Sequence, residues 1–586
     1  MDSSGKVWRL LPYEPAHIDR LSRELQLSPI VAQLLLNRNL SDAPGVKRFL
    51  DAPLKGLYEP ERLPGAADAA NRLFQAVQAK RPICIYGDYD VDGVTGTAIL
   101  LTLLRMLGAT VDYYIPNRLD EGYGLSVEAL RTIAGRGAAL VVTVDCGIAS
   151  VVEADEARRL GLELIVTDHH EPAAMLPQAA ALVHPRLPGA DTPYPFGDLC
   201  GSGVALKLAW ALCKRACASD KVTEPMREFL MDAVVLAALG TIADVVPLQD
   251  ENRILVRYGL TRLQSHPSVG LQALMQVARL QEKSLLVSMD IAFGLAPRLN
   301  AAGRLGAANH AVELLTTASA QRAEALAQQL QQRNLERQTL ERDIFQQARE
   351  LAEGCNGAPA LVLAKEAWHP GLLGIVASRL VETFRRPALM ISLRDDGGPA
   401  QGSGRSAADL PLHEALGKCA SDLVSHGGHA RAAGFRILPQ NIPAFREHFC
   451  EVAESYLGTG QALEPLVIDA EVPLAALTLG LVRDLDRLEP FGAANPQPRF
   501  LAGDLDIVGE PRKVGNGDRH LSFRVRQQGK DYRAIAFFKA DRVDSLLSAD
   551  RKCSLVFTPR INEWQGFKSV ELEVCDFQPG ARARLA

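Results

Sequence analysis

The sequence Gly87-Asp88-Tyr89-Asp90-Val91-Asp92-Gly93 carries three alternating carboxylates. It directly follows the apolar run Ile83-Cys84-Ile85-Tyr86, which is typical of a strand buried in a parallel sheet. After Gly93 the apolar residues recur with helical periodicity. The carboxylates therefore lie at the carboxyl end of a strand, where open α/β sheets bind ligands. Because three ionised carboxylates repel one another without a cation, the stretch predicts a divalent metal site; taken alone, a solvated acidic turn is the alternative.

Three further apolar runs, at residues 110–116, 138–144 and 162–167, predict strands of the same sheet. Helical segments separate them, which is typical of a parallel, doubly wound α/β fold with right-handed crossovers. Asp145 follows the second of these runs, and Asp168-His169-His170 follows the third. A single aspartate after a strand is more often a turn residue or a helix N-cap. Since parallel strands end at one sheet edge, convergence of several clusters there favours a shared site.

The residue types of these clusters indicate the chemistry. Carboxylates with one or two imidazoles suit Mn²⁺ or Mg²⁺ and are compatible with Zn²⁺. A surplus of carboxylates lets one of them bridge two ions about 3.5–4 Å apart, the arrangement that supports phosphodiester hydrolysis. The sequence contains neither a G-x-x-x-x-G-K-[ST] loop nor a G-x-G-x-x-G strand turn, so use of nucleoside triphosphates or dinucleotides is not indicated.

Composition excludes some other classes of protein. The chain has 586 residues, which predicts about three to five domains. Its net charge of −5 argues against a strongly basic nucleic-acid coat, although a local basic groove is compatible with it. There is no apolar run long enough for a membrane span and no signal core at the N-terminus. The ten cysteines form no C-x-x-C pair, so we expect reduced thiols, no zinc site built from cysteines and a cytoplasmic location.

The motifs Asp-Tyr-Asp-Val-Asp-Gly at 88–93, Val-Asp-Cys-Gly at 144–147 and Asp-His-His at 168–170 together resemble the DHH phosphoesterase superfamily. Within it, nearly the whole chain is similar to the RecJ single-stranded-DNA exonucleases. A fourth segment, residues 239–247, resembles the last metal-binding aspartate segment of that family. The resemblance implies that the metal ligands are Asp90, Asp92, Asp145, His169 and Asp244, with Asp88 as a ligand or a support for one.

The resemblance also implies roles within this set. Asp145 is expected to bridge the two ions, and Asp145, His169 and His170 are the expected catalytic residues. His170 is expected to meet the scissile phosphate. Asp168 is expected to orient a histidine rather than to bind metal.

Several further residues are expected to contact the substrate. Arg118, in the loop at 116–124, resembles an arginine that RecJ-like enzymes use to hold a 5′ phosphate, because a guanidinium is always charged and binds phosphate bidentately. An exposed loop arginine is the alternative. Segment 290–306 resembles another family segment, whose Arg298, Asn300 and Arg304 could line the substrate path; the arginines could equally cap helices or bridge domains.

A second α/β domain carries three glycine-containing loops, at 368–371, 402–406 and 427–434, that resemble the DHH-associated substrate-binding domain. Glycines let backbone amides approach a phosphate closely. Ser403, Arg405 and His429 are the expected substrate contacts there. Glycine-rich turns without a binding role are the alternative.

The expected organisation has five parts. They are a helical segment at 1–60, a DHH catalytic domain at 61–316, a long connecting helix at 317–355, the DHH-associated domain at 356–460 and an OB-fold β-barrel at 461–586. In the barrel, basic and aromatic residues could bind a single strand, and the candidates are Lys513, Arg519, Arg524, Trp564 and Lys568. The loop at 489–496 is distinctive, but its residues indicate no chemical role.

The resemblance therefore implies an exonuclease that uses two Mn²⁺ or Mg²⁺ ions to degrade single-stranded DNA from the 5′ end into mononucleotides, in DNA repair and recombination. A monomer is expected, with a single-strand-binding protein and a helicase as partners. One alternative is a DHH phosphodiesterase for short oligonucleotides or cyclic dinucleotides, or a pyrophosphatase, but small substrates need no C-terminal barrel. A non-catalytic DNA-binding scaffold should have lost metal ligands, whereas every matched position carries a metal-competent residue.

Overall fold

The computed structural model describes residues 7–118, 121–355, 357–394, 396–407, 410–457, 465–548, 550–564 and 566–585, without the side chains of Leu457 and Trp564. The chain forms two compact units. We call Met1–Leu57, Pro247–Arg257 and Leu463–Ala586 the barrel unit, and Tyr58–Val246 and Tyr258–Ala462 the two-sheet unit. Within the described residues, none of the helices combines the length and the apolar character that crossing a membrane requires.

The first sheet of the two-sheet unit is parallel throughout, in the order β3-β2-β4-β5-β6. Its strands are β2 (Ile83–Gly87), β3 (Val111–Tyr114), β4 (Leu140–Val144), β5 (Glu163–Thr167) and β6 (Ala181–Val183). The predicted doubly wound α/β fold is thus confirmed. The edge strand β6 was not predicted, because three residues are too few to show a period. The strand order reverses between β2 and β4, which is the point where such sheets bind ligands.

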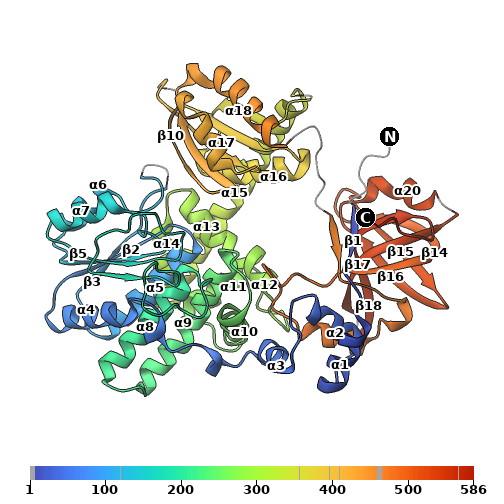
Figure 1. Ribbon diagram of the computed structural model, residues 1–586, viewed down its shortest axis with the longest axis horizontal. Coiled ribbons are helices and arrows are strands. Elements are labelled where there is room, and N and C mark those ends of the chain that lie inside the picture. The colour runs from blue at the N-terminus through green and yellow to red at the C-terminus, as the bar shows by residue number, and fades with distance from the viewer. Residues whose placement is uncertain are drawn as a thin grey trace. The chain divides into compact units, whose positions relative to one another are not determined.

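Helices cover both faces of this sheet (Figure 1). On one face α6 (Val127–Gly135) and α7 (Val151–Arg159) share an apolar core with alternate residues of β2, β4 and β5. On the other side α5 (Val91–Met106) packs against α8 (Gly201–Cys217) and α9 (Glu224–Ala243), and α4 (Ala66–Gln78) packs against α8. Because α5 is buried nearly all round, the acidic stretch at its start is held in a rigid frame.

A helical region follows the sheet and ends in the predicted long helix. Its elements are α10 (Asp250–Ser265), α11 (Val269–Val277), α12 (Ser288–Asp290), a π-helical turn at Ile291–Leu295, α13 (Ala296–Arg304), α14 (Ala308–Thr316) and α15 (Ala320–Glu353). The 34-residue helix α15 packs against α11, α13 and α14, and its last turns enter the core of the second sheet. It therefore joins the two halves of the two-sheet unit, as the sequence predicts.

The second sheet is mixed, in the order β10-β11-β9-β8-β7. Only β7 and β8 are parallel to each other. The strands are β7 (Leu361–Glu366), β8 (Ala388–Leu393), β9 (Ala400–Arg405), β10 (Leu423–Gly428) and β11 (Ala432–Ile437), and the helices are α16 (Leu373–Phe384), α17 (Leu412–Lys418) and α18 (Ile442–Leu457).

The sequence interpretation of residues 402–406 as a loop is wrong. Gly402-Ser403-Gly404-Arg405 lies in strand β9, where a Cβ on Gly402 would come within 2.2 Å of the Phe435 ring. The glycine therefore serves the packing of that ring onto the strand. Gly427 and Gly428 likewise end strand β10. Glycine weakens a strand pattern in the sequence, which is why these strands read as loops.

The barrel unit contains a closed five-stranded barrel, because β14 pairs with both β15 and β17. The strands are β14 (Phe500–Val514), β15 (His520–Gln527), β16 (Lys530–Ala536), β17 (Lys552–Trp564) and β18 (Phe567–Pro579), and the predicted OB-fold is confirmed. Smaller elements of the same part of the chain are β12 (Leu466–Ile468), β13 (Ala470–Glu471), α19 (Leu479–Asp486) and α20 (Val543–Leu547).

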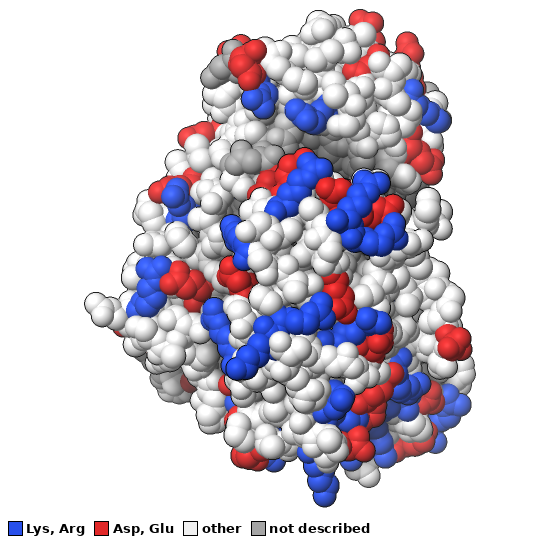
Figure 2. Space-filling view, turned by 90° about the vertical axis from the view of Figure 1, so that its left-hand side faces the viewer, with Lys and Arg blue, Asp and Glu red and all other residues white. Residues whose placement is uncertain are grey.

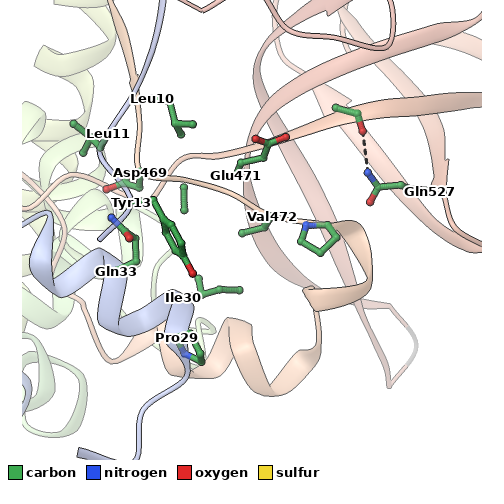
Figure 3. A pocket seen from close by; sticks show the side chains of 13 residues that line it. Leu10, Leu11, Tyr13, Pro29, Ile30, Gln33, Asp469, Glu471, Val472 and Gln527 are labelled. Atoms are coloured by element: carbon green, nitrogen blue, oxygen red, sulfur yellow. Dashed lines mark hydrogen bonds between the residues drawn. The ribbon is translucent and has the colours of Figure 1, made fainter. Parts of the chain in front are cut away.

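The N-terminal helices belong to the same unit as the barrel. Buried residues of α1 (Pro15–Leu25), α2 (Pro29–Leu36) and α3 (Ala43–Asp51) form one apolar cluster with barrel residues. Before them, β1 (Trp8–Leu10) pairs with β12 in parallel. Residues of the N-terminal segment and of β13 line a cavity of about 620 Å³, and Tyr13 is one of the side chains that line it (Figure 3). It is lined by none of the predicted site residues.

Candidate metal centre and substrate contacts

The structure brings the predicted acidic clusters together in the two-sheet unit. Asp88 follows β2 and Asp145 follows β4, on either side of the point where the strand order reverses. Asp168, His169 and His170 follow β5, and Asp244 is the C-cap of α9. Three groups of ligand atoms each lie within 4.8 Å of one another: Asp88, Asp90 and Asp145; Asp92, His169 and Asp244; and Asp145, His169 and His170.

Two of the carboxylates are held by the starts of helices. Asp92 is 1% exposed, and its two oxygens accept from the backbone N–H groups of Gly201 (2.5 Å) and Ser202 (2.9 Å), the first residues of α8. Asp90 caps α5 and accepts from the N–H groups of Asp92 (2.9 Å) and Gly93 (3.1 Å). Helix N-termini favour negative charge, so these two carboxylates are oriented in advance.

Close packing around the cluster explains two glycines. A Cβ on Gly240 of α9 would come within 2.4 Å of Asp92 Oδ1, and one on Gly201 would come within 2.6 Å of the Asp145 Cβ. Neither position has room for a side chain. The helices α8 and α9 can therefore approach the carboxylates only because glycine stands at these two places.

Three buried polar atoms of the cluster have no hydrogen-bond partner among the described residues: Asp88 Oδ1, Asp145 Oδ1 and His169 Nε2. His169 Nε2 lies 3.1 Å from Asp145 Oδ1 without hydrogen-bond geometry, and 3.6 Å from Asp244 Oδ2. A buried polar atom without a partner costs about 1–3 kcal/mol. Asp145 lies in one ligand group with Asp88 and in another with His169, so these unpartnered atoms fit bound cations, and their oxygen and imidazole donors suit Mn²⁺ or Mg²⁺.

The electrostatics of the cluster favour the same ligand. Burial and then the neighbouring carboxylates raise the pKa of Asp244 to about 8, and they raise the pKa values of Asp88 and Asp145 well above the ordinary range. Burial lowers the pKa of His169 to about 4. A divalent cation would reverse the first of these effects, because it favours ionised carboxylates.

Asp168 holds His170. Its Oδ1 accepts from His170 Nδ1 (2.8 Å) and from two backbone N–H groups, while Oδ2 accepts from the N–H of Ile148 (2.9 Å). Although burial opposes both shifts, this hydrogen bond lowers the pKa of Asp168 to about 2 and raises that of His170 to about 9. His170 is thus expected to be cationic at neutral pH. The Tyr123 hydroxyl, which the sequence did not single out, lies 3.1 Å from the same ring.

Arginines from both halves of the two-sheet unit form a second cluster, which we call the arginine cluster: Arg118, Arg304 and Arg405. Arg118 lies over the ring of Tyr89, 5.0 Å from its centroid. Burial and then the nearby Arg118, Arg337 and Arg405 lower the pKa of Arg304 to about 10. Arg405 donates to Ser403 Oγ at 3.4 Å. Like charges held together in this way suit an anion such as a phosphate.

The other predicted substrate residues are not part of the arginine cluster. Arg298 donates to Gln331 (2.7 Å) and to two backbone carbonyls, so its guanidinium bridges helices. Asn300 accepts from the N–H of Val91 (3.1 Å) and thus supports the start of α5. His429 is exposed after β10, and among the described residues no contact joins its side chain to the arginine cluster. His369, in the loop at 368–371, was not among the expected substrate contacts, yet its buried Nδ1 has no hydrogen-bond partner among the described residues and lies beside Gly371.

The charges on one face of the molecule are mixed. Figure 2 shows lysine and arginine side chains interspersed with aspartate and glutamate, with no continuous basic surface on that face. This agrees with the net charge of −5. On this face, a nucleic acid would have to be bound by local groups rather than by a continuous basic surface.

A parallel sheet with such an acidic cluster and a mixed second sheet define the DHH class of proteins. A family model for the N-terminal domain of the DHH family matches residues 82–238, one for the DHHA1 domain matches 357–455, and one for the RecJ OB domain matches 468–576. The single-stranded-DNA-specific exonuclease RecJ of Bacillus subtilis is 37% identical over 98% of this chain and 71% of its own length. RecJ of Escherichia coli is 34% identical over 94% of this chain and 96% of its own.

Solved structures lead to the same family. The crystal structure of Thermus thermophilus RecJ with Mn²⁺ matches with a TM-score of 0.83 at 34% identity, covering 99% of this chain and 80% of that one. The Mg²⁺ complex of the same protein matches with a TM-score of 0.77. This chain belongs to the RecJ family, as the sequence motifs predicted.

Proposed function

We propose that this chain is a Mn²⁺- or Mg²⁺-dependent exonuclease that degrades single-stranded DNA from the 5′ end and releases 5′ mononucleotides. The observation that carries the proposal is the convergence of three unpartnered buried atoms, Asp88 Oδ1, Asp145 Oδ1 and His169 Nε2, among further carboxylates. The relatives named single-stranded-DNA-specific exonucleases, and the RecJ structures with Mn²⁺ and Mg²⁺, support the substrate and the metal.

Two ions fit the donors. Asp88, Asp90 and Asp145 would hold one, and Asp92, His169 and Asp244 the other; Asp145 Oδ1 also lies 3.1 Å from Nε2 of His169, a ligand of the second group. When bound, the ions supply Lewis-acid activation of water and neutralise negative charge on the phosphate. The chain's own groups orient the substrate. His170, kept cationic by Asp168, donates a hydrogen bond to a phosphate oxygen, and Tyr123 limits the rotation of its ring.

By binding the 5′ phosphate, the arginine cluster would set the end from which the strand is degraded. Arg118, Arg304 and Arg405, with Ser403, would hold the terminal 5′ phosphate. Arg118 lies over Tyr89, the residue between Asp88 and Asp90, so the arginine cluster adjoins the acidic cluster. A strand whose 5′ phosphate is fixed there presents its first internucleotide bond to the metal centre.

The experiment that tests the function uses one oligonucleotide in four forms. It compares single and double strands, each with a 5′ phosphate or a 5′ hydroxyl, labelled at the 3′ end, with Mn²⁺. We expect shortening from the 5′ end of the single strand only, and at least about tenfold slower cleavage without the 5′ phosphate. In Arg118→Ala this preference should disappear. Faster turnover of dinucleotides or cyclic dinucleotides than of the long single strand would favour the phosphodiesterase alternative and contradict the proposal.

Among the candidate residues of the barrel, Arg519 has the surroundings that best suit binding of a single strand. Phe537 and Phe538 are 45% and 70% exposed, and Phe538 has a φ of +55°, a strained conformation for a bulky residue. Its N–H donates to His520 Nδ1 (3.0 Å), and Arg519 lies over its ring. Exposed aromatic rings beside cationic groups stack unpaired bases. Lys513 and Arg524 are exposed nearby on β14 and β15, whereas Lys568 is paired with Glu563.

The remaining expectations also stay proposals. They are the domain limits 1–60, 61–316, 317–355, 356–460 and 461–586, a monomer, a cytoplasmic location, a role in repair and recombination, and a single-strand-binding protein and a helicase as partners. The need for an unpaired substrate supports the last two, because another protein must open or protect the duplex. Sedimentation of the chain alone, and of mixtures with each partner, tests the monomer and the complexes.

A further inference from the structure

The cavity that the N-terminal segment and β13 line lies wholly within the barrel unit (Figure 3). Its volume of about 620 Å³ falls within the range of about 300–1,000 Å³ that is typical of ligand pockets. Much of its wall is apolar, with Leu10 and Leu11 after β1, Ile30 on α2 and Val472 after β13. Because Gln33 supplies its most buried polar group, we call this cavity the Gln33 pocket.

Gln33 presents an unpaired acceptor to this pocket. The residue is 4% exposed, and its Nε2 donates to the carbonyl of Pro12 (2.9 Å) and to Asn37 Oδ1 (2.7 Å). Both partners are acceptors, so the orientation of the amide is fixed. Its Oε1 is buried and has no hydrogen-bond partner among the described residues. Figure 3 shows the end of this side chain turned toward the side of the pocket where Tyr13 lies. A ligand with an N–H group would therefore gain a hydrogen bond here without breaking an internal one.

The other polar side chains of the pocket differ in whether they are engaged. Gln527 donates to the carbonyl of Gly503 (2.8 Å), the contact drawn in Figure 3. Asp469 accepts from the N–H of Arg499 (3.0 Å). Glu471 is exposed, and no hydrogen bond or ion pair within the described part of the chain engages its carboxylate. None of the described residues that line the pocket is a lysine, an arginine or a histidine. The pocket therefore offers a free carboxylate and excludes anions.

An aromatic ring completes the pocket. Tyr13 is 70% exposed, and Figure 3 shows its ring among the lining side chains. A cationic group positioned over the face of such a ring is attracted by it, and a planar cation can also stack on it. One ligand can thus meet a ring face, a neutral acceptor and a carboxylate at the same time.

We infer that the Gln33 pocket binds an arginine side chain of a partner protein, in a segment with apolar residues on either side of that arginine. A guanidinium is planar and carries five N–H donors, so it can lie on Tyr13 while it donates to Gln33 and Glu471. Its methylene stem and the apolar neighbours would cover Leu10 and Ile30. A lysine has the same charge, but it has neither the planar fork nor the stacking face.

The pocket is distinct from the surface proposed to bind a single strand. His520, which begins β15, contacts Phe538, whereas Gln527 at the end of the same strand lines the pocket. Seven residues of an extended strand span about 23 Å. A phosphate backbone in the pocket would meet Glu471 and no basic lining residue, so a nucleic acid is not the expected occupant. The inference thus goes beyond the proposed nuclease function, and binding should need neither metal nor DNA.

A labelled peptide with the sequence Ser-Ala-Leu-Arg-Leu-Ala-Ser serves as the probe. It is titrated with the full chain in a chelator, and binding is followed by fluorescence anisotropy. We expect saturable binding of this peptide. Matched peptides that carry citrulline or glutamate in place of the arginine should bind at least about tenfold more weakly, because citrulline keeps the planar donors but has no charge and glutamate reverses the charge.

Two exposed side chains provide variants that should fold. Tyr13→Ala and Glu471→Gln should each weaken binding of the arginine peptide about tenfold, and Glu471→Gln should leave the citrulline peptide unchanged. Gln33→Met keeps a side chain of similar volume but removes the acceptor, so it should weaken both peptides; thermal unfolding checks that it is folded. The matched control is Glu24→Gln, which alters an exposed carboxylate of α1 outside the pocket and should bind as the wild type does.

Three results would overturn the inference. They are equal binding of the arginine and glutamate peptides, wild-type affinity in both Tyr13→Ala and Glu471→Gln, and no binding of the arginine peptide up to about 1 mM. Displacement of the peptide by a single-stranded oligonucleotide would assign the pocket to nucleic acid and would also overturn it. A wild-type chain that binds the peptide but cleaves no DNA with Mn²⁺ would contradict the proposed function alone.

Discussion

Asp145 belongs to two of the three groups of potential metal ligands, and it is only 2% exposed. Its backbone has a φ of +65°, a conformation that aspartate tolerates better than most residues. Burial and neighbouring carboxylates hold its pKa far above the ordinary range, so the charge has a cost when no cation is present. In the proposed metal centre, the same residue would therefore stabilise the loaded site and destabilise the empty one.

Asp145→Asn separates these two effects. Without metal, the variant should unfold at a higher temperature than the wild type, because one buried carboxylate that its neighbours repel is gone. Its free energy of unfolding should be larger by on the order of 1 kcal/mol. With Mn²⁺, its exonuclease rate should fall at least about a hundredfold, since a proposed metal ligand is lost. Thermal unfolding in a chelator and rate measurements with Mn²⁺ check both. A variant that cleaves as fast as the wild type would show that Asp145 is not a ligand.

At the scale of elements, the barrel unit contains a titrating group outside the metal centre. Burial raises the pKa of Glu489, in the loop at 489–496, to about 7. The folded state thus binds this proton more tightly than the unfolded chain, whose glutamate pKa is about 4.3. The stability that the proton contributes is present at low pH and is lost as the pH rises through about 4.3 to 7.

Glu489→Gln should remove this dependence. The variant keeps an acceptor for the N–H of Phe491, which now donates to Glu489 Oε2 at 2.7 Å. We expect it to be more stable than the wild type by about 1–3 kcal/mol near pH 8 and nearly equal to it near pH 5. Urea unfolding at the two pH values measures the difference. Equal gains at both would mean that Glu489 is already ionised at about pH 5.

The end of strand β16 carries the exposed pair Phe537 and Phe538. Replacing both by alanine should raise KM for a long single strand about tenfold or more, because each stacked base contributes about 1–3 kcal/mol. An oligonucleotide too short to reach the barrel from the metal centre should be cleaved as before. The Phe567→Ala variant, which alters another exposed ring of the barrel, is the control. Equal losses on long and short substrates would place the defect in folding instead.

How far the sequence predicted these elements depends on the range of the contacts. Asp88, Asp145 and His169 could be brought together in advance because buried parallel strands end at one edge, and local patterns identify such strands. Ser403 and Arg405 were expected in a loop, since glycines mask the strand pattern of β9. The support that Asn300 gives to Val91 was not predictable, because it joins residues 209 positions apart.

At the scale of the whole molecule, the sequence also did not predict which parts of the chain share an apolar core. The N-terminal helices read as a separate preface, but Ile18, Val31, Leu34 and Leu50 lie in one buried cluster with barrel residues. The first and last parts of the chain therefore fold as one body. Local periodicity shows that these helices have an apolar face, and only the tertiary structure shows which surface covers it.

A chain ended at about residue 457 tests this organisation. It would keep the two-sheet unit and expose the apolar faces of α1, α2 and α3 that the barrel covers. We expect residues 15–51 to become sensitive to limited proteolysis while residues 66–246 stay resistant, because helices of this length are marginal in water without packing. Mass spectrometry of the fragments locates the cuts, and the full chain is the control. Protection of residues 15–51 in the shortened chain would mean that the helices have a second packing surface, and that the barrel is not what holds them.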